Sequence, residues 1–208
     1  MTAAERDGAS ATPTLHRREV VAALLAGRGD LLVVAGLGAS AWDCAAAGDH
    51  PLTFSFWGGM GLAAMTGLGL ALARPDRRVL VVTGDGEMLM GLGSLATVAV
   101  QAPANLSIVV LDNERYGETG MQRTHTAHGV DLARVAKACG FPAAATLTDA
   151  AELAGLREAV HHARGPLFTV VKVQAEKPPL VVPPREGTLL KSRFRDALAG
   201  APGPSSNP

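Results

Sequence analysis

Hydrophobic positions along the chain fall into two alternating kinds of segment. Short, nearly unbroken apolar runs rich in β-branched residues are typical of strands buried on both faces of a sheet. Such runs cover residues 30–38, 77–86, 106–113 and 166–173, with a shorter extended piece at 52–56. Helical spacing of apolar positions marks the segments between them, at residues 15–28, 40–47, 59–73, 92–101 and 130–140. The alternation predicts an α/β fold, a doubly wound and mostly parallel sheet with helices on both faces.

The longest apolar run covers residues 59–73 and ends at Arg74 and Pro75. It is shorter than the roughly 18 to 20 apolar residues that a membrane span needs, and it is rich in glycine. We therefore expect a buried helix here and no membrane partner.

Both ends of the chain differ in composition from the middle. Residues 1–13 are small and polar, and residues 201–208 are rich in Pro, Gly and Ser. Neither segment can bury enough apolar surface to offset the entropy of ordering. We predict disordered tails at 1–13 and 201–208 and a single domain at 14–200.

Composition narrows the classes of partner. In 208 residues, 19 lysines and arginines balance 19 aspartates and glutamates, and aromatic residues make up 4%. A neutral chain with few aromatic side chains has neither the charge nor the stacking surface that nucleic acids require, so a small molecule is the expected ligand. Cys44 and Cys139 match no zinc or CxxC spacing and follow no signal peptide, which predicts a cytoplasmic location.

The strand ends carry the candidate chemistry. Gly84-Asp85-Gly86 ends one apolar run, and Asn113 ends the next. The carboxyl ends of parallel strands face one crevice, where ligands bind. Carboxylate and amide oxygens suit Mg²⁺, and the glycines allow backbone N–H groups to approach a phosphate. Taken alone, Gly-Asp-Gly could equally be a simple turn.

The two-part pattern resembles the thiamine diphosphate motif, a GDG followed by an Asn, with 26 residues here (Glu87 to Asp112) between the parts. The resemblance implies that thiamine diphosphate and Mg²⁺ bind here, with Asp85, Asn113 and the backbone oxygen of Arg115 as metal ligands. In similar enzymes a bulky apolar residue wedges between the two cofactor rings, and Met60 in "GGMG" matches it. A methionine can fill such an irregular gap. The implied cofactor-binding set is Gly38, Ala39, Ser40, Gly58, Gly59, Met60, Gly84, Asp85, Gly86, Glu87, Asn113, Arg115, Tyr116 and Gly117.

The segments "LGSLAT", "ETGMQ", "VDLARVAKACG" and "LLKSRFRDAL" are similar to parts of the sulfopyruvate and phosphonopyruvate decarboxylases, over Leu15 to Leu198. This resemblance implies decarboxylation of a 2-oxo acid. In that family the glutamate that acts on the pyrimidine ring lies in a separate domain, for which this chain has no room. We therefore expect one subunit of a hetero-oligomer, α2β2 or larger, that is inactive without a pyrimidine-domain (alpha-type) subunit.

Several residues bear on the substrate. Met60, Gln122 and His125 are the expected catalytic residues, and Glu118 and Arg123 could also contact the substrate. Arg123 favours a small anionic 2-oxo acid. Glu87 departs from the pattern, because an acid beside the diphosphate repels phosphate unless it is turned away or bound to a cation.

Three alternatives stay open. "GGMGLAA" imitates the GxGxxA of an NAD-binding fold, with Asp85 falling 24 residues after Gly61, although this leaves Asn113 unexplained. The chain could belong to a carboligase similar to acetolactate synthase. It could also be a subunit that binds cofactor for assembly only. His125 and His128 are interpreted as solvated histidines rather than a metal pair, because no third ligand lies near them in sequence.

Overall fold

A computed structural model describes residues 13–200. Nearly all of the predicted N-terminal tail and all of the predicted C-terminal tail, residues 1–12 and 201–208, lie outside the described residues. The disorder predicted for them stays a prediction.

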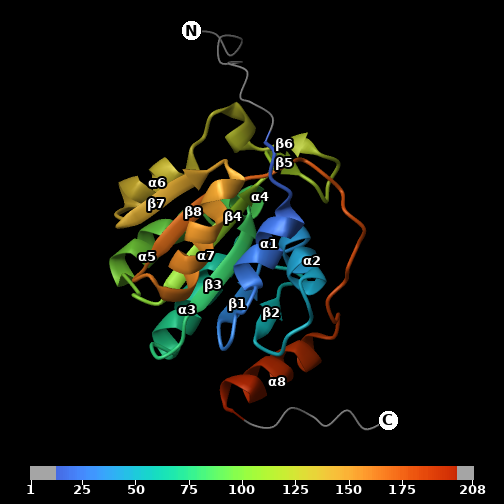
Figure 1. The fold of residues 1–208 in the computed structure, drawn as a ribbon, viewed down its shortest axis with the longest axis vertical. Coiled ribbons are helices and arrows are strands. Elements are labelled where there is room, and N and C mark those ends of the chain that lie inside the picture. The colour runs from blue at the N-terminus through green and yellow to red at the C-terminus, as the bar shows by residue number, and fades with distance from the viewer. Residues whose placement is uncertain (1–12, 201–208) are drawn as a thin grey trace.

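Within residues 13–200, six strands form one sheet in the order β2-β1-β3-β4-β8-β7, and every neighbouring pair is parallel (Figure 1). The strands are β1 Leu32–Ala35, β2 Thr53–Ser55, β3 Val79–Gly84, β4 Leu106–Asp112, β7 Ala143–Leu147 and β8 Leu167–Lys172. Strand β2 lies beside β1 at one edge of the sheet, and β3 lies on the other side of β1. The strand order therefore reverses between β1 and β3, and a ligand crevice is expected at the carboxyl ends of these two strands.

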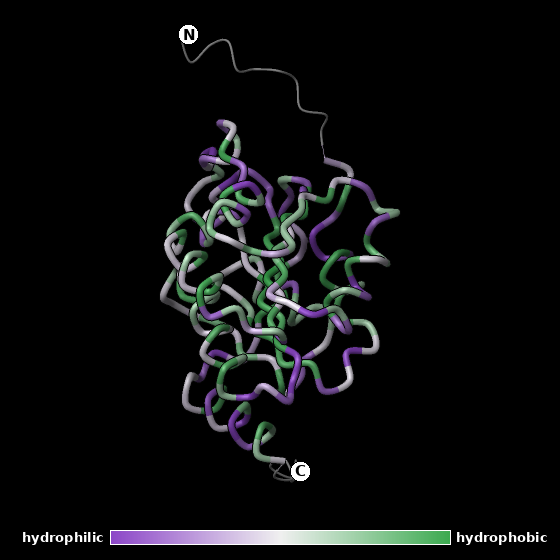
Figure 2. The backbone as a smooth tube through the Cα atoms, turned by 90° about the vertical axis from the view of Figure 1, so that its left-hand side faces the viewer, coloured by the Kyte–Doolittle hydropathy of each residue, from purple (hydrophilic) through white to green (hydrophobic). Residues whose placement is uncertain are grey.

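Helices cover both faces of the sheet, as predicted (Figure 1). The helices are α1 Arg17–Leu25, α2 Ala39–Ala46, α3 Ala63–Ala73, α4 Asp85–Met90, α5 Ser94–Gln101, α6 Leu132–Cys139, α7 Leu153–His162 and α8 Gly187–Leu198. Side chains alternate along β3, so that Val81 packs with α3 and α5 while Leu80 packs with α1 and α2. Figure 2 shows the hydrophobic strand segments running through the middle of the molecule. A hydrophobic core lies on each face of the sheet, which confirms the predicted α/β fold.

The structure departs from the sequence prediction at several elements. Helices α7 and α8 lie outside the segments that residue spacing predicted as helical. Strand β7 was not predicted, because only two of its five residues are buried and the segment has no apolar run. Helix α4 begins at Asp85, inside the run at residues 77–86 that was predicted as a strand. Helix α3 is not fully buried: Leu62 just before it is 50% exposed, and Met65 and Leu72 within it are 40% and 49% exposed. No helix in residues 13–200 is both long enough and apolar enough to cross a membrane.

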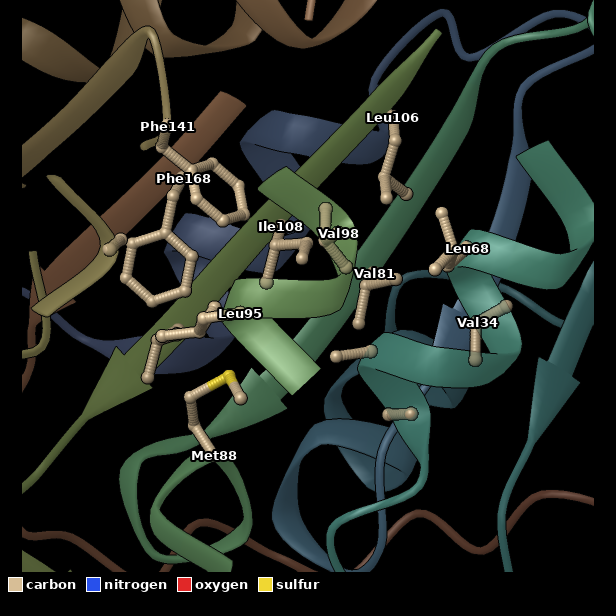
Figure 3. Close-up of a cluster of buried hydrophobic side chains, with 14 of the residues drawn as sticks. Val34, Leu68, Val81, Met88, Leu95, Val98, Leu106, Ile108, Phe141 and Phe168 are labelled. Carbon is tan, nitrogen blue, oxygen red and sulfur yellow. The ribbon is translucent and has the colours of Figure 1, made fainter. Parts of the chain in front are cut away.

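The core between the sheet and helices α3, α5 and α6 contains an aromatic pair (Figure 3). Phe168 of β8 is 1% exposed and meets Phe141 edge-on, with ring centroids 5.7 Å apart. Phe168→Ala should therefore lower the free energy of unfolding by about 3 to 5 kcal/mol in urea titrations, because it leaves a cavity. Leu180→Ala, at a position 58% exposed, is the control, and equal losses for the two variants would contradict this account of the core.

Candidate functional site

A cavity of about 400 Å³ opens at the carboxyl ends of the central strands. Eleven of the fourteen cofactor residues predicted from sequence line its wall, and these are Ala39, Ser40, Met60, Gly84, Asp85, Gly86, Glu87, Asn113, Arg115, Tyr116 and Gly117. The rest of the wall consists of Arg17, Leu37, Met90, Leu111, Glu118, Thr119 and Val173. The fold thus brings together loops after β1, β3 and β4 that lie far apart in sequence.

Asp85 is a buried acid in this wall, 2% exposed, at the point where β3 passes into α4. The Thr124 hydroxyl donates to its Oδ2 (2.6 Å), and the Thr126 hydroxyl lies 3.2 Å from the same oxygen. Oδ1 is therefore available to a ligand. Burial and, to a smaller extent, the Asp112 carboxylate raise the pKa of Asp85 to about 6, and the hydrogen bonds from the two threonines oppose the shift. A cation bound at Oδ1 would compensate this cost of burying a charge.

Asn113 and Arg115 complete a set of oxygen donors. The Asn113 Oδ1 accepts a hydrogen bond from the backbone N–H of Arg115 (2.9 Å), a local turn that fixes the loop after β4. No group of three or more His, Cys, Asp or Glu side chains that could hold a metal occurs in the described part of the chain. Asp85, Asn113 and Arg115 line one cavity. A carboxylate, an amide and a backbone carbonyl from these residues, together with phosphate oxygens, would match the preference of a hard divalent cation.

Sequence reasoning missed Asp112, which is connected to Asp85 through the Thr126 hydroxyl. Its Oδ1 lies 2.8 Å from the Thr126 hydroxyl, and its Oδ2 accepts from the Lys172 ammonium (2.9 Å). Lys172 also donates to Glu114 (2.6 Å). The only signal in the sequence was an aspartate closing an apolar strand. This network orients the threonines that hold the candidate metal ligand.

Glu87 is a buried acid of the cavity wall, and groups of the chain itself hold its carboxylate. It is 4% exposed, and its Oε2 accepts from the backbone N–H of Leu37 (3.0 Å) and from the Thr83 hydroxyl (2.8 Å). Burial raises its pKa, and the Thr83 hydroxyl and the N–H groups of Ala63, Leu37 and Gly61 oppose the shift. The carboxylate therefore joins the loop after β1 to the end of β3.

Met60 stands against the Gly-Asp-Gly turn. A Cβ added to Gly86 would lie 2.5 Å from Cε1 of Tyr116 and 3.5 Å from Cε of Met60, so only glycine fits between them. Gly59 and Gly61 on either side of Met60 have φ values of 75° and 90°, in the left-handed region that favours glycine. The glycines set the path of the loop that presents Met60 to the cavity.

Some predicted residues lie off the wall. Gly38, Gly58 and Gly59 do not line the cavity, although Gly38 and Gly59 each adjoin a residue that does. Gln122, Arg123 and His125 are exposed outside it, in β6 (Gln122–Arg123) and the 3₁₀ turn His125–His128, and Gln122 bonds to Thr119. The catalytic roles assigned to Gln122 and His125 stay predictions, and in this chain alone neither reaches the cavity.

Comparison with known proteins gives the class. Residues 37–173 match the family described as thiamine pyrophosphate enzyme, C-terminal TPP binding domain. The chain therefore belongs to the thiamine pyrophosphate enzymes, as a C-terminal TPP binding domain. The NAD-binding alternative has no support from this match.

Particular relatives narrow the class further. Sulfopyruvate decarboxylase subunit beta of Methanococcus maripaludis is 33% identical, over 88% of this chain and 98% of its own length. That of Methanothermobacter thermautotrophicus is 44% identical, over 61% of this chain and 68% of its own. Phosphonopyruvate decarboxylase of Streptomyces viridochromogenes is 47% identical over 60% of this chain, which matches only 31% of that protein. Within its class, the chain groups with these decarboxylases.

The fold is shared with larger enzymes. Benzoylformate decarboxylase from Polynucleobacter necessarius superimposes with a TM-score of 0.64 at 21% identity, over 80% of this chain and 34% of that one. At this level of identity the likeness establishes the architecture alone.

Proposed function

We propose that this chain is the diphosphate- and Mg²⁺-binding subunit of a two-subunit, thiamine diphosphate-dependent 2-oxo-acid decarboxylase. The observation that carries the proposal is the placement of Asp85, Asn113, Arg115 and Gly86 around one cavity of a TPP binding domain. The oxygen donors there fit Mg²⁺, and the names of the relatives point to decarboxylation.

When bound, the cofactor supplies the thiazolium that accepts the electrons released as CO₂ leaves. The residues of this chain bind and orient it. Asp85, Asn113 and the carbonyl of Arg115 would hold the cation, and Met60 would pack against the rings of the cofactor. Leu37 and Met90 add apolar side chains to the cavity wall, and such side chains limit the access of water to a bound cofactor.

An exposed apolar surface on α3 and α4 supports the proposal that a second chain binds here. Leu62, Met65 and Leu72 project from one side of α3, and Met90 of α4 is 67% exposed beside Gly61. Large apolar side chains exposed along one side of a helix that begins beside a binding site are typical of a protein interface. We infer that a pyrimidine-domain subunit covers this surface and brings the catalytic glutamate to the cofactor. The subunit names of the relatives agree with a partner.

Met65→Glu should prevent assembly, because it buries a charge in the proposed interface. The measurement is co-purification with a co-expressed pyrimidine-domain chain. Leu180→Glu, at an exposed apolar position of the segment after β8, is the matched control and should assemble normally. Normal assembly of Met65→Glu would place the interface elsewhere.

The assembled complex tests the activity itself, with pyruvate, sulfopyruvate and phosphonopyruvate compared as substrates. We expect CO₂ and the corresponding aldehyde from the complex and no turnover from this chain alone. A coupled carbon–carbon product would instead indicate a carboligase. A complex that binds the cofactor and Mg²⁺ yet turns over none of the three acids would support a role in assembly only.

A further inference from the structure

Arg17, at the start of α1, is a cation in the cavity wall that the sequence analysis did not single out. It is 5% exposed, and its Nε and Nη1 are buried without a hydrogen-bond partner among the described residues. Its Nη1 lies 2.8 Å from Oδ2 of Asp43 in an ion pair that lacks hydrogen-bond geometry. Buried donors without partners are costly, so this guanidinium has unused capacity for a ligand in the cavity.

Asp43 pairs with two arginines, so the three side chains together carry one net positive charge. Arg18 also binds this carboxylate, with Nε 3.2 Å from Oδ1, so two guanidinium groups share one acid. Burial raises the pKa of Asp43, and Arg17 and Arg18 oppose the shift. Arg18 directs its Nη2 to the carbonyl of Pro179 (2.9 Å) and does not line the cavity. Of the two arginines, only Arg17 lines the cavity.

The surroundings of Arg17 suit a phosphate. Ala39 and Ser40, in the first turn of α2, line the same cavity, and a helix start favours anions. Glu118 lies against Gly38, where an added Cβ would be 3.1 Å from Oε1 of the glutamate. Burial raises the pKa of Glu118, while Arg17 and Lys177 lower it, which places Arg17 within its electrostatic reach.

Acidic side chains outnumber cationic ones in the cavity wall, which favours a phosphate-binding role for Arg17. Two cations, Arg17 and Arg115, face three acids, Asp85, Glu87 and Glu118. A diphosphate entering such a cavity meets net repulsion, which a metal ion at Asp85 offsets only in part. Arg115 directs its Nη1 to the carbonyl of Glu114 (2.9 Å). In Arg17, Nη1 pairs with Asp43, and Nε has no hydrogen-bond partner among the described residues.

From this geometry we propose that the Arg17 guanidinium binds the terminal phosphate of the cofactor directly and selects the diphosphate over the monophosphate. The inference rests on the proposed function only in taking thiamine diphosphate as the ligand. It assigns this chain a phosphate-binding residue outside the Gly-Asp-Gly and Asn motif.

Arg17→Gln and Arg18→Gln form a matched pair, because each removes one guanidinium from Asp43 and only the first alters the cavity wall. Calorimetric titration of the full chain with Mg²⁺ and thiamine diphosphate should show affinity about 10- to 100-fold weaker for Arg17→Gln. Arg18→Gln should stay within about threefold, and thiamine monophosphate should bind similarly to both variants and to the wild type. Equal diphosphate affinities for the two variants would overturn the inference and leave the proposed function standing. No binding of the diphosphate by the wild type would overturn both.

Folding is monitored by thermal unfolding without ligand, where both variants should lose similar stability. Arg17→Lys provides the second test, because it keeps the charge near Asp43 while losing the planar fork. It should bind the monophosphate like the wild type and the diphosphate with intermediate affinity. Wild-type affinity of Arg17→Lys for the diphosphate would show that the guanidinium makes no specific contact.

Discussion

Asp85→Asn should weaken Mg²⁺-dependent binding of thiamine diphosphate by more than about 100-fold, a larger loss than supporting residues of a metal site usually cause. At the same time the variant should be at least as stable as the wild type. The carboxylate is 2% exposed, and burial raises its pKa to about 6, so its charge is a cost to the folded chain without a cation. Asparagine keeps the shape and the acceptor for Thr124 and removes the charge.

Two measurements separate these effects. Titration calorimetry with and without Mg²⁺ gives the affinity, and urea unfolding without ligand gives the stability. Asp30→Asn removes an exposed acid far from the cavity and should change neither. Cofactor affinity within twofold of the wild type for Asp85→Asn would remove Asp85 from the metal site.

Gly36→Ala should lower the free energy of unfolding by about 2 to 4 kcal/mol, which combines overpacking with the loss of buried hydrogen bonds. A Cβ at this position would overlap Oε2 of Glu87 and lie 3.1 Å from the Thr83 hydroxyl. Glu87 cannot move aside without giving up its bonds to Leu37 and Thr83. The substitution should therefore also loosen the loop after β1 and reduce cofactor affinity.

A double-mutant cycle tests this contact. Because Glu87→Ala removes the atom that a new methyl group would strike, Gly36→Ala should cost less in that background than in the wild type. Gly93→Ala, where nothing lies within 4 Å of an added Cβ, controls for loss of glycine as such. Additive costs in the cycle would show that the carboxylate does not occupy the space at Gly36.

Much of the fold follows from local pattern. The runs that became β1, β3, β4 and β8 are apolar because both faces of each strand are covered, and this leaves a strong signal. Edge strand β7, "AAATL", leaves a weak one, because only Ala144 and Leu147 are buried. The exposed side of α3 could not be separated from its buried side, since both are apolar.

The candidate site was predictable where motif residues follow strand ends. Asp85 and Asn113 were placed in one crevice from topology alone, and both line the cavity. Arg17 lies about seventy residues earlier, on a helix whose first turn reaches the cavity only in the folded chain. Its role depends on a tertiary arrangement that no local spacing records. The roles of Gln122 and His125 and the cytoplasmic location stay predictions.

The most direct test of the account is a calorimetric titration of the full chain with thiamine diphosphate, in the presence of Mg²⁺ and again after chelation. The account predicts one cofactor bound per chain with Mg²⁺ and a large loss of affinity without it, because the diphosphate and Asp85 share the cation. NAD serves as the comparison ligand and should not bind. Binding of NAD without Mg²⁺-dependent binding of thiamine diphosphate would contradict the central claim.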